Sequence, residues 1–415
     1  MEHEIARRTA LQGLRVLDLC THATQYCGKL LAQLGAEVIL VEPPAGSATR
    51  RTGPFVGDQP HMERSLSYAY LNQGKKGACL DASTPEGRDL VLKLARTADI
   101  VIEDWGVGVL ERFGLGYADL CAARSSVVLT RISPYGQTGP YSTYVADDLT
   151  TLAMGGLLYL GGYPDTAPLA AYGQQAYLAA AQFAAVGSLI ALWECETASG
   201  SGQLVDVSIQ ECVSMALENA AQFVDLEATV RRRNGGQQRQ AGTGVFSCGD
   251  GMVYLMAGGI AGNRFWNATA SWLQDVGAPG AASLLEPQWQ DPEFLASDDA
   301  KAQFEGVFLP YASTRTKAQL YAEGQRRRIP ICPVSTSADL LVNPQLRHRQ
   351  FFQETDHPYT GMSFAVPGAP YRLTETPWRL GAPAPRLGEH TASILSELGI
   401  GFMDQELLLL SGGTA

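Results

Sequence analysis

The segment "LRVLDLCTHATQYCGKLLAQLGAEVILVE", Leu14–Glu42, decides the fold of this chain. Its first residues, Leu14–Cys20, form a short apolar run that predicts a buried strand. The run "EVILVE" at Glu37–Glu42 predicts a second strand. The leucine spacing between them predicts an amphipathic helix that stops at Gly35. The segment therefore reads as a βαβ unit of about 30 residues, which predicts two neighbouring parallel strands.

The same pattern repeats downstream. Thr84 is a suitable N-cap and Pro85 a suitable first residue for a helix that we expect to run through Ala98. The apolar runs "DIVIED" (99–104) and "SVVLTRIS" (126–133) then predict two more strands. Alternating strands and helices indicate an α/β, Rossmann-like wound parallel sheet whose ligand crevice lies at the carboxyl ends of the strands.

Composition and motifs exclude several classes of protein. The net charge of -11 argues against a nucleic-acid partner, and we expect no membrane span and a cytoplasmic location. Neither GxGxxG nor GxxxxGK[ST] is present, which argues against a dehydrogenase and a P-loop nucleotide site. The 8 cysteines contain no CxxC pair and the 6 histidines no HExxH, so no metal site is expected.

Several further segments, taken together with the first, resemble the class III (CaiB/BaiF) CoA-transferases. They follow the order of that family and span nearly the whole chain. They are "LRVLDL", "LLAQLGAEVILVEPP", "LNQGKKGACLDASTPEGRDLVLKL", "VGVLERFGLGYADL", "ISPYGQTGPYS", "SGSGQLVDVSIQE", "IPICPVSTSADLLVNPQLRHRQFF", "VPGAPYRLTETP" and "APAPRLGEHT".

The resemblance implies a large Rossmann-like domain built from both ends of the chain and a smaller α+β domain inserted between them. A length of 415 residues fits two domains, and the composition becomes polar, basic and glycine-rich near "ATVRRRNGG". We expect residues 1–225 to begin the large domain, 226–330 to form the small domain with its linkers, and 331–415 to return to the large domain. The resemblance also implies a dimer of protomers threaded through each other as interlocked rings.

The resemblance implies transfer of CoA between carboxylic acids, in which an aspartate attacks the acyl-CoA thioester. Alignment on Gly187 assigns that aspartate to Tyr177, and no carboxylate occurs between Ala167 and Leu192. A tyrosine hydroxyl with a pKa of about 10 is a poor nucleophile at neutral pH. We therefore expect no catalytic residue in this chain.

Other positions that bind CoA in the family also differ here. Leu40 replaces a lysine, Gly106 replaces an arginine or histidine that approaches the CoA phosphates, and Ala23–Gln25 replaces an Ala-Gly-Pro turn. Each lost charge-assisted contact is worth about 1.5–3 kcal/mol. We expect a degenerate CoA site, with no tightly bound cofactor and with the CoA thioester substrate held mainly by a partner subunit.

Five residues match the family's CoA-binding segments and are the candidate binding residues: Asn72, Lys75, Lys76, Tyr135 and Gln137. For the lysines a solvated loop is an equally good interpretation, and for the "SPYGQTGPY" segment an ordinary turn is at least as good.

Two histidines and two basic runs have simpler interpretations than a binding role. His22 follows the first strand, where a ligand would approach, but a lone histidine is weak evidence. His390 suits a structural capping contact, with Thr391 as the cap of a last helix. We interpret the basic runs at residues 231–234 and 326–330 as solvated surface.

The leading functional hypothesis is a non-catalytic subunit of a heteromeric class III CoA-transferase, of the kind that acts in anaerobic aromatic degradation. Its partner would be a homologous catalytic subunit, in a heterodimer or a dimer of heterodimers. One alternative is a homodimeric acyl-CoA transferase or racemase that uses another acid–base residue, for which Asp147 or Asp148 is the best candidate. The other alternative is a non-enzymatic acyl-CoA binding protein.

Overall fold

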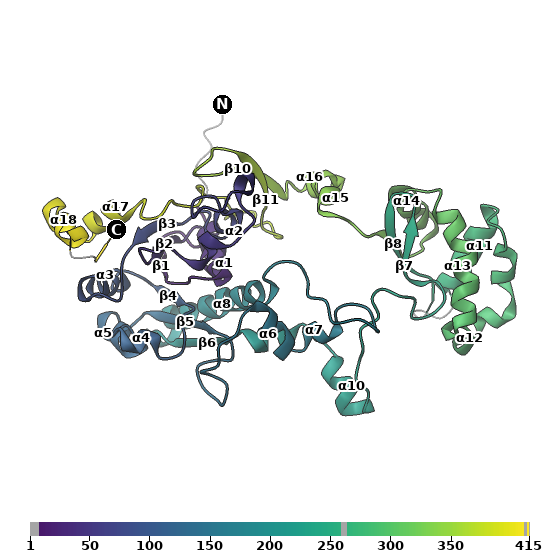
Figure 1. Ribbon diagram of the computed structural model, residues 1–415, viewed down its shortest axis with the longest axis horizontal. Coiled ribbons are helices and arrows are strands. Elements are labelled where there is room, and N and C mark those ends of the chain that lie inside the picture. Colours follow the sequence, from purple (N-terminus) through teal and green to yellow (C-terminus); the bar gives the residue numbers. More distant parts are fainter. Residues whose placement is uncertain (1–7, 259–263, 411–412, 415) are drawn as a thin grey trace. The chain divides into compact units, whose positions relative to one another are not determined.

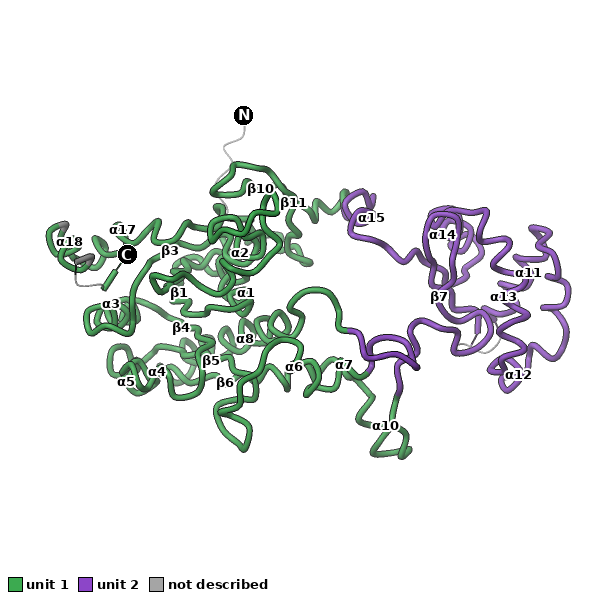
Figure 2. Tube along the Cα trace, viewed as in Figure 1, with its two compact units in different colours: residues 1–159, 170–231, 347–415 green, residues 160–169, 232–346 purple. Residues whose placement is uncertain are grey.

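The computed structural model describes residues 8–258, 264–410 and 413–414, which form two compact units (Figures 1 and 2). Unit 1 contains residues 1–159, 170–231 and 347–415, and unit 2 contains residues 160–169 and 232–346. Unit 1 is thus built from both ends of the chain. Compared with the expected middle segment 226–330, unit 2 begins six residues later, extends to 346 and adds a short piece at 160–169.

Unit 1 is organised around a six-stranded sheet in which every neighbouring pair of strands is parallel. The strand order is β3-β2-β1-β4-β5-β6, so the direction of winding reverses between β1 and β4. This is the order of a doubly wound nucleotide-binding fold, and it confirms the α/β, Rossmann-like prediction. The strands are β1 (Arg15–Asp18), β2 (Glu37–Glu42), β3 (Lys76–Cys79), β4 (Ile100–Glu103), β5 (Val128–Ser133) and β6 (Leu204–Ser208).

Helices cover both faces of the parallel sheet. Because side chains alternate along a strand, Ile100 and Ile102 pack in a core cluster with α1 and α8, while Val101 packs in a second cluster with α3 and α5. The helices of unit 1 are α1 (Tyr26–Gln33), α2 (Leu66–Leu71), α3 (Pro85–Ala95), α4 (Val109–Arg112), α5 (Tyr117–Ala123), α6 (Asp148–Met154), α8 (Gln175–Glu194), α9 (Ile209–Met215), α10 (Ala220–Glu227), α17 (Thr391–Glu397) and α18 (Phe402–Leu410).

Local sequence signals explain where several helices begin and end. Gly35, with φ of 104°, terminates α1 in the left-handed conformation that glycine adopts without strain. Thr84 caps α3 through its hydroxyl, which accepts from the Gly87 N–H at 3.0 Å, although the helix ends at Ala95 and not Ala98. The expectation that Thr391 caps the last helix is wrong, because its hydroxyl accepts from the Cys79 N–H of β3 at 2.9 Å.

Unit 2 has its own aromatic core. The hairpin of β7 (Thr243–Cys248) and β8 (Gly251–Met256) pairs antiparallel with β9 (Ile331–Pro333). Buried Trp266 and Trp289 stack with their ring centroids 4.5 Å apart. The helices are α11 (Arg264–Asp275), α12 (Pro292–Ala296), α13 (Asp298–Ala312), α14 (Lys317–Arg327) and α15 (Ser337–Val342).

The remaining elements are two short helices near the limits of the units and one small sheet. These are α7 (Leu157–Leu160), α16 (Pro344–His348) and the antiparallel pair β10 (Phe352–Asp356) and β11 (Ser363–Pro367), which belongs to unit 1.

Helix α8 is long and strongly apolar. The stretch Gln175–Ser199 is long and apolar enough to cross a membrane by length and composition, which the sequence analysis did not anticipate. Half of its most apolar window is buried, and the helix packs against α9. It also packs against β5 and α1 (Figure 1). These contacts are those of a core helix that covers one face of the sheet.

Candidate functional site

The candidate site lies at the carboxyl ends of β1 and β4, where the strand order reverses. Open α/β sheets bind their ligands at this switch point. A cavity of about 370 Å³ occupies it, and its lining includes His22, Asp104, Trp105, Gly106 and Tyr177. A second cavity, of about 450 Å³, shares His22 and Tyr177 with the first.

Asp104 organises the loop that follows β1. Its carboxylate accepts from the backbone N–H groups of Thr21 and His22, both at 2.9 Å, and from the Thr24 hydroxyl at 2.5 Å. His22 Nδ1 lies 3.2 Å from the same carboxylate. Burial opposes the charge on Asp104, but these hydrogen bonds and the imidazole hold its pKa below the usual value. The hydrogen bond to Asp104 in turn raises the pKa of His22.

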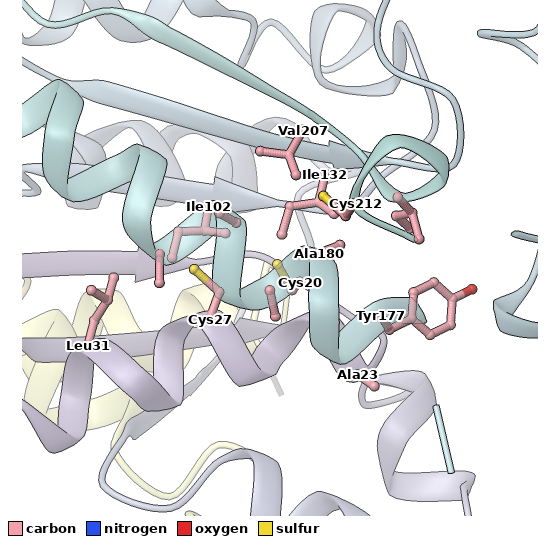
Figure 3. Close-up of a cluster of buried hydrophobic side chains, with 14 of the residues drawn as sticks. Cys20, Ala23, Cys27, Leu31, Ile102, Ile132, Tyr177, Ala180, Val207 and Cys212 are labelled. Carbon is pink, nitrogen blue, oxygen red and sulfur yellow. The ribbon is translucent and has the colours of Figure 1, made fainter. Parts of the chain in front are cut away.

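Tyr177 stands in the first turn of α8, at the edge of the core cluster (Figure 3). The residue is 9% exposed, and its ring stacks on His22 with centroids 5.8 Å apart. Its hydroxyl points away from the apolar side chains of the cluster (Figure 3). Burial and, to a smaller extent, the negative charges of Asp104 and Asp148 raise the pKa of Tyr177 to about 12. This environment opposes formation of a nucleophilic phenolate.

The neighbouring carboxylates serve as helix caps. Asp148 Oδ1 accepts from the N–H groups of Ala176 at 2.8 Å and Tyr177 at 3.1 Å, at the beginning of α8. Burial raises the pKa of Asp148. Asp147 is the N-cap of α6, and its carboxylate accepts from the Thr150 N–H at 2.8 Å, which lowers its pKa. Both candidates for an alternative acid–base group are thus engaged by backbone donors.

Asn72 and Lys75 belong to a buried polar network. The Lys75 ammonium group donates to Asp18 Oδ2 at 2.7 Å, to the Gln25 carbonyl at 2.7 Å and to Asn72 Oδ1 at 2.8 Å. A lysine has three N–H donors, and all three are used here. Asn72 also donates to the Gln25 side chain at 2.8 Å. Close packing around this network requires a glycine at position 28, because a Cβ there would clash with the Asp18 carboxylate.

The other three candidate binding residues lie apart from this network. Lys76 is partly exposed and pairs with Glu37 at 2.5 Å. Tyr135 makes an edge contact with Tyr141, their centroids 6.1 Å apart. The backbone N–H of Gln137 donates to Asp206 at 3.0 Å, while its buried side-chain amide has no hydrogen-bond partner among the described residues. In the described part of the chain, none of these five residues lines either of the two cavities at the switch point.

The three departures from the family pattern have different structural consequences. Leu40 is fully buried in a small cluster with Tyr68 and Ala384. Residues Ala23–Gln25 form a short 3₁₀ helix in which the Gln25 side chain is buried and hydrogen-bonded. Gly106 lines the switch-point cavity and brings no charge to it.

Sequence reasoning missed the role of Asp104 and its neighbour Trp105. Their position directly after the β4 run was a usable signal, because residues that follow parallel strands meet at the ligand-binding edge. His22 was noticed for this reason, and the structure supplies its partner. His390 makes a structural contact but not the expected capping one, since its Nδ1 accepts from the Gly77 N–H of β3 at 3.1 Å and its side chain does not cap α17. Among the described residues, no group of three or more side chains is arranged to hold a metal ion.

Comparisons with known proteins agree on one family. The profile of CoA-transferase family III matches residues 11–391. The chain is 40% identical to the succinyl-CoA:(R)-benzylsuccinate CoA-transferase subunit BbsE of Thauera aromatica, over 96% of each chain. It is 31% identical to the succinyl-CoA–D-citramalate CoA-transferase of Chloroflexus aurantiacus, again over 96% of each. A crystal structure of a CaiB/BaiF family protein from Brucella suis superposes with a TM-score of 0.80 and 27% identity, covering 94% of this chain and 100% of that one. The chain belongs to CoA-transferase family III, the CaiB/BaiF family of enzymes, which act on CoA thioesters.

Proposed function

We propose that this chain is the non-catalytic subunit of a heteromeric class III CoA-transferase that moves CoA from succinyl-CoA to benzylsuccinate. The observation that supports this proposal most strongly is the residue at position 177. Tyr177 stands where the family pattern requires an aspartate, and its pKa is about 12. The similarity to a benzylsuccinate CoA-transferase subunit supports the choice of substrates. A homologous partner supplies the nucleophilic aspartate.

The partner subunit also holds most of the CoA thioester. Two of the five candidate binding residues, Asn72 and Lys75, are occupied by the buried network with Asp18. Gly106 offers no cation to a phosphate, and Lys76 is neutralised by Glu37. Charge-assisted contacts contribute most to phosphate binding, so this set of residues supports weak CoA binding by this chain.

The exposed face of α8 supports the existence of a partner chain. A helix that is apolar on all sides is normally buried on all sides, and a contiguous exposed apolar patch marks an interface. Four large side chains repeat along the open face of α8 at helical spacing, with exposed fractions between 45% and 67%: Phe183, Val186, Ile190 and Trp193. We assign this face to the homologous subunit. The interlocked-ring arrangement and the cytoplasmic location stay predictions.

Co-expression with a homologous subunit that contains the aspartate tests the proposal. The expected result is CoA transfer from succinyl-CoA to benzylsuccinate by the pair and none by this chain alone. Activity of the isolated chain would favour a homodimeric enzyme, and Asp148→Asn would then identify the carboxylate involved. Acyl-CoA binding without activity in any pair would favour a binding protein. As a control, the isolated chain with Tyr177→Asp should stay inactive, because the cations that the family has at the positions of Leu40 and Gly106 remain absent.

A further inference from the structure

Two basic side chains at the switch-point cavity, those of His22 and Arg112, have polar atoms that no contact described above uses. His22 Nδ1 faces Asp104 and the Thr21 hydroxyl, which leaves Nε2 as the ring nitrogen open to a ligand. Arg112, at the end of α4, lines the same cavity. Within the part of the chain that the structure describes, neither His22 Nε2 nor the Arg112 guanidinium has a hydrogen-bond partner.

The acidic groups around His22 are engaged elsewhere. Asp104, from the end of β4, accepts two backbone N–H groups and the Thr24 hydroxyl as well as the imidazole. Asp147 and Asp148, from α6, accept from the first turns of α6 and α8. Tyr177, from α8, presents a neutral ring to the imidazole. The polar groups that remain open in this cavity are therefore His22 Nε2 and the Arg112 guanidinium, and these basic groups favour an anion.

The rest of the cavity lining is largely apolar and includes one aromatic ring that is held in place. The Trp105 indole is fixed by a hydrogen bond to the Leu19 carbonyl at 2.8 Å and by an edge contact with Phe113 at 5.8 Å. Other apolar lining residues are Val107, Val109, Ile132, Tyr144 and Ile209. Apolar walls with a few placed polar groups are the usual form of a small-molecule site, and a cavity of about 370 Å³ is within the usual size range.

We propose that the switch-point cavity of this chain binds a free carboxylic acid with a ring-sized apolar substituent, its carboxylate against His22 Nε2 and Arg112 and its ring beside Trp105. This inference rests on the proposed function for the identity of the acid, but not for the existence of the site. In this proposal the switch-point cavity binds the free acid and not the CoA thioester.

Isothermal titration calorimetry of the purified full-length chain with three probes separates the contribution of the ligand's charge to binding from the contribution of its ring. The probes are (R)-benzylsuccinate, succinate, which lacks the ring, and dimethyl benzylsuccinate, which lacks the charge. We expect benzylsuccinate to bind at least about tenfold more tightly than either of the others. His22→Gln should remove this preference over the diester. His348→Gln is the matched control, since this exposed histidine is not in the cavity lining.

The pH dependence adds a second readout. The hydrogen bond to Asp104 raises the pKa of His22 above its ordinary value, so the positive charge of the imidazole is lost as pH rises through this raised folded-state pKa. Benzylsuccinate should therefore bind more weakly at high pH in the natural chain and show no such change in His22→Gln. Equal affinity for acid and diester, or equal binding by the natural chain and His22→Gln, would overturn the inference. Transfer activity of the complex with no acid bound by this chain would overturn the inference and leave the proposed function standing.

Discussion

Removing the hydroxyl of Tyr177 tests whether this residue has a chemical role. With a pKa of about 12, only roughly one molecule in 10⁵ has a phenolate at pH 7. The hydroxyl also points away from the core cluster, so Tyr177→Phe leaves the packing of α8 and the stacking on His22 in place. We expect the complex with Tyr177→Phe to retain its transfer rate within about twofold.

The assay is the initial rate of CoA transfer by the reconstituted complex, with kcat and KM measured separately for donor and acceptor. Loss of a covalent nucleophile typically lowers kcat by roughly 10⁴- to 10⁶-fold, so the two outcomes are far apart. The matched variant is the substitution of Asn for the nucleophilic aspartate of the partner, which should abolish activity. A loss of more than about 100-fold in kcat in Tyr177→Phe, with unchanged KM, would refute the reasoning.

Three further predictions concern the buried network, the His22 pair and the α8 face. Lys75→Met should lower the free energy of unfolding by about 3–5 kcal/mol in urea titrations, because it leaves the buried Asp18 carboxylate without its ion-pair partner. Lys76→Met should lower it by less than about 1 kcal/mol, because the pair of Lys76 with Glu37 is partly exposed. Equal effects of the two substitutions would show that the burial of Lys75 is unimportant. Asp104→Asn should lower the pKa of His22, measured by NMR titration. It should also remove the part of the folding stability that the natural chain loses as pH rises through the pKa of His22. An unchanged His22 titration would contradict the contact between His22 and Asp104. Ile190→Asp should weaken association with the partner subunit in sedimentation experiments while the thermal stability of the isolated chain stays the same, since Ile190 is 61% exposed.

The fold was predictable because its signals are local. The apolar runs and helix limits between Leu14 and Glu42 lie within one βαβ unit, and the Thr84 cap needs only a residue three positions away. The end of α3 was set three residues too late, since helix ends depend on capping contacts that a short pattern does not contain. The segment 331–346 joins unit 2 through contacts that are distant in sequence.

The candidate site was less predictable because its partners are far apart in sequence. Lys75 and Asp18 are 57 positions apart, so no local pattern distinguishes a buried structural lysine from one on a solvated loop. The bond between Thr391 and Cys79 spans 312 positions, and it replaced the expected capping role. His22 and Asp104 are separated by 82 positions and meet only because β1 and β4 are neighbours.

Trapping the covalent intermediate is the most direct measurement of the central claim. The complex is mixed with succinyl-CoA in the absence of an acceptor acid, quenched, and the intact mass of each chain is determined. A non-catalytic role predicts a mass increase, from acyl or CoA attachment, on the partner subunit alone. A mass increase on this chain, mapped to Tyr177 or to any other residue, would contradict it.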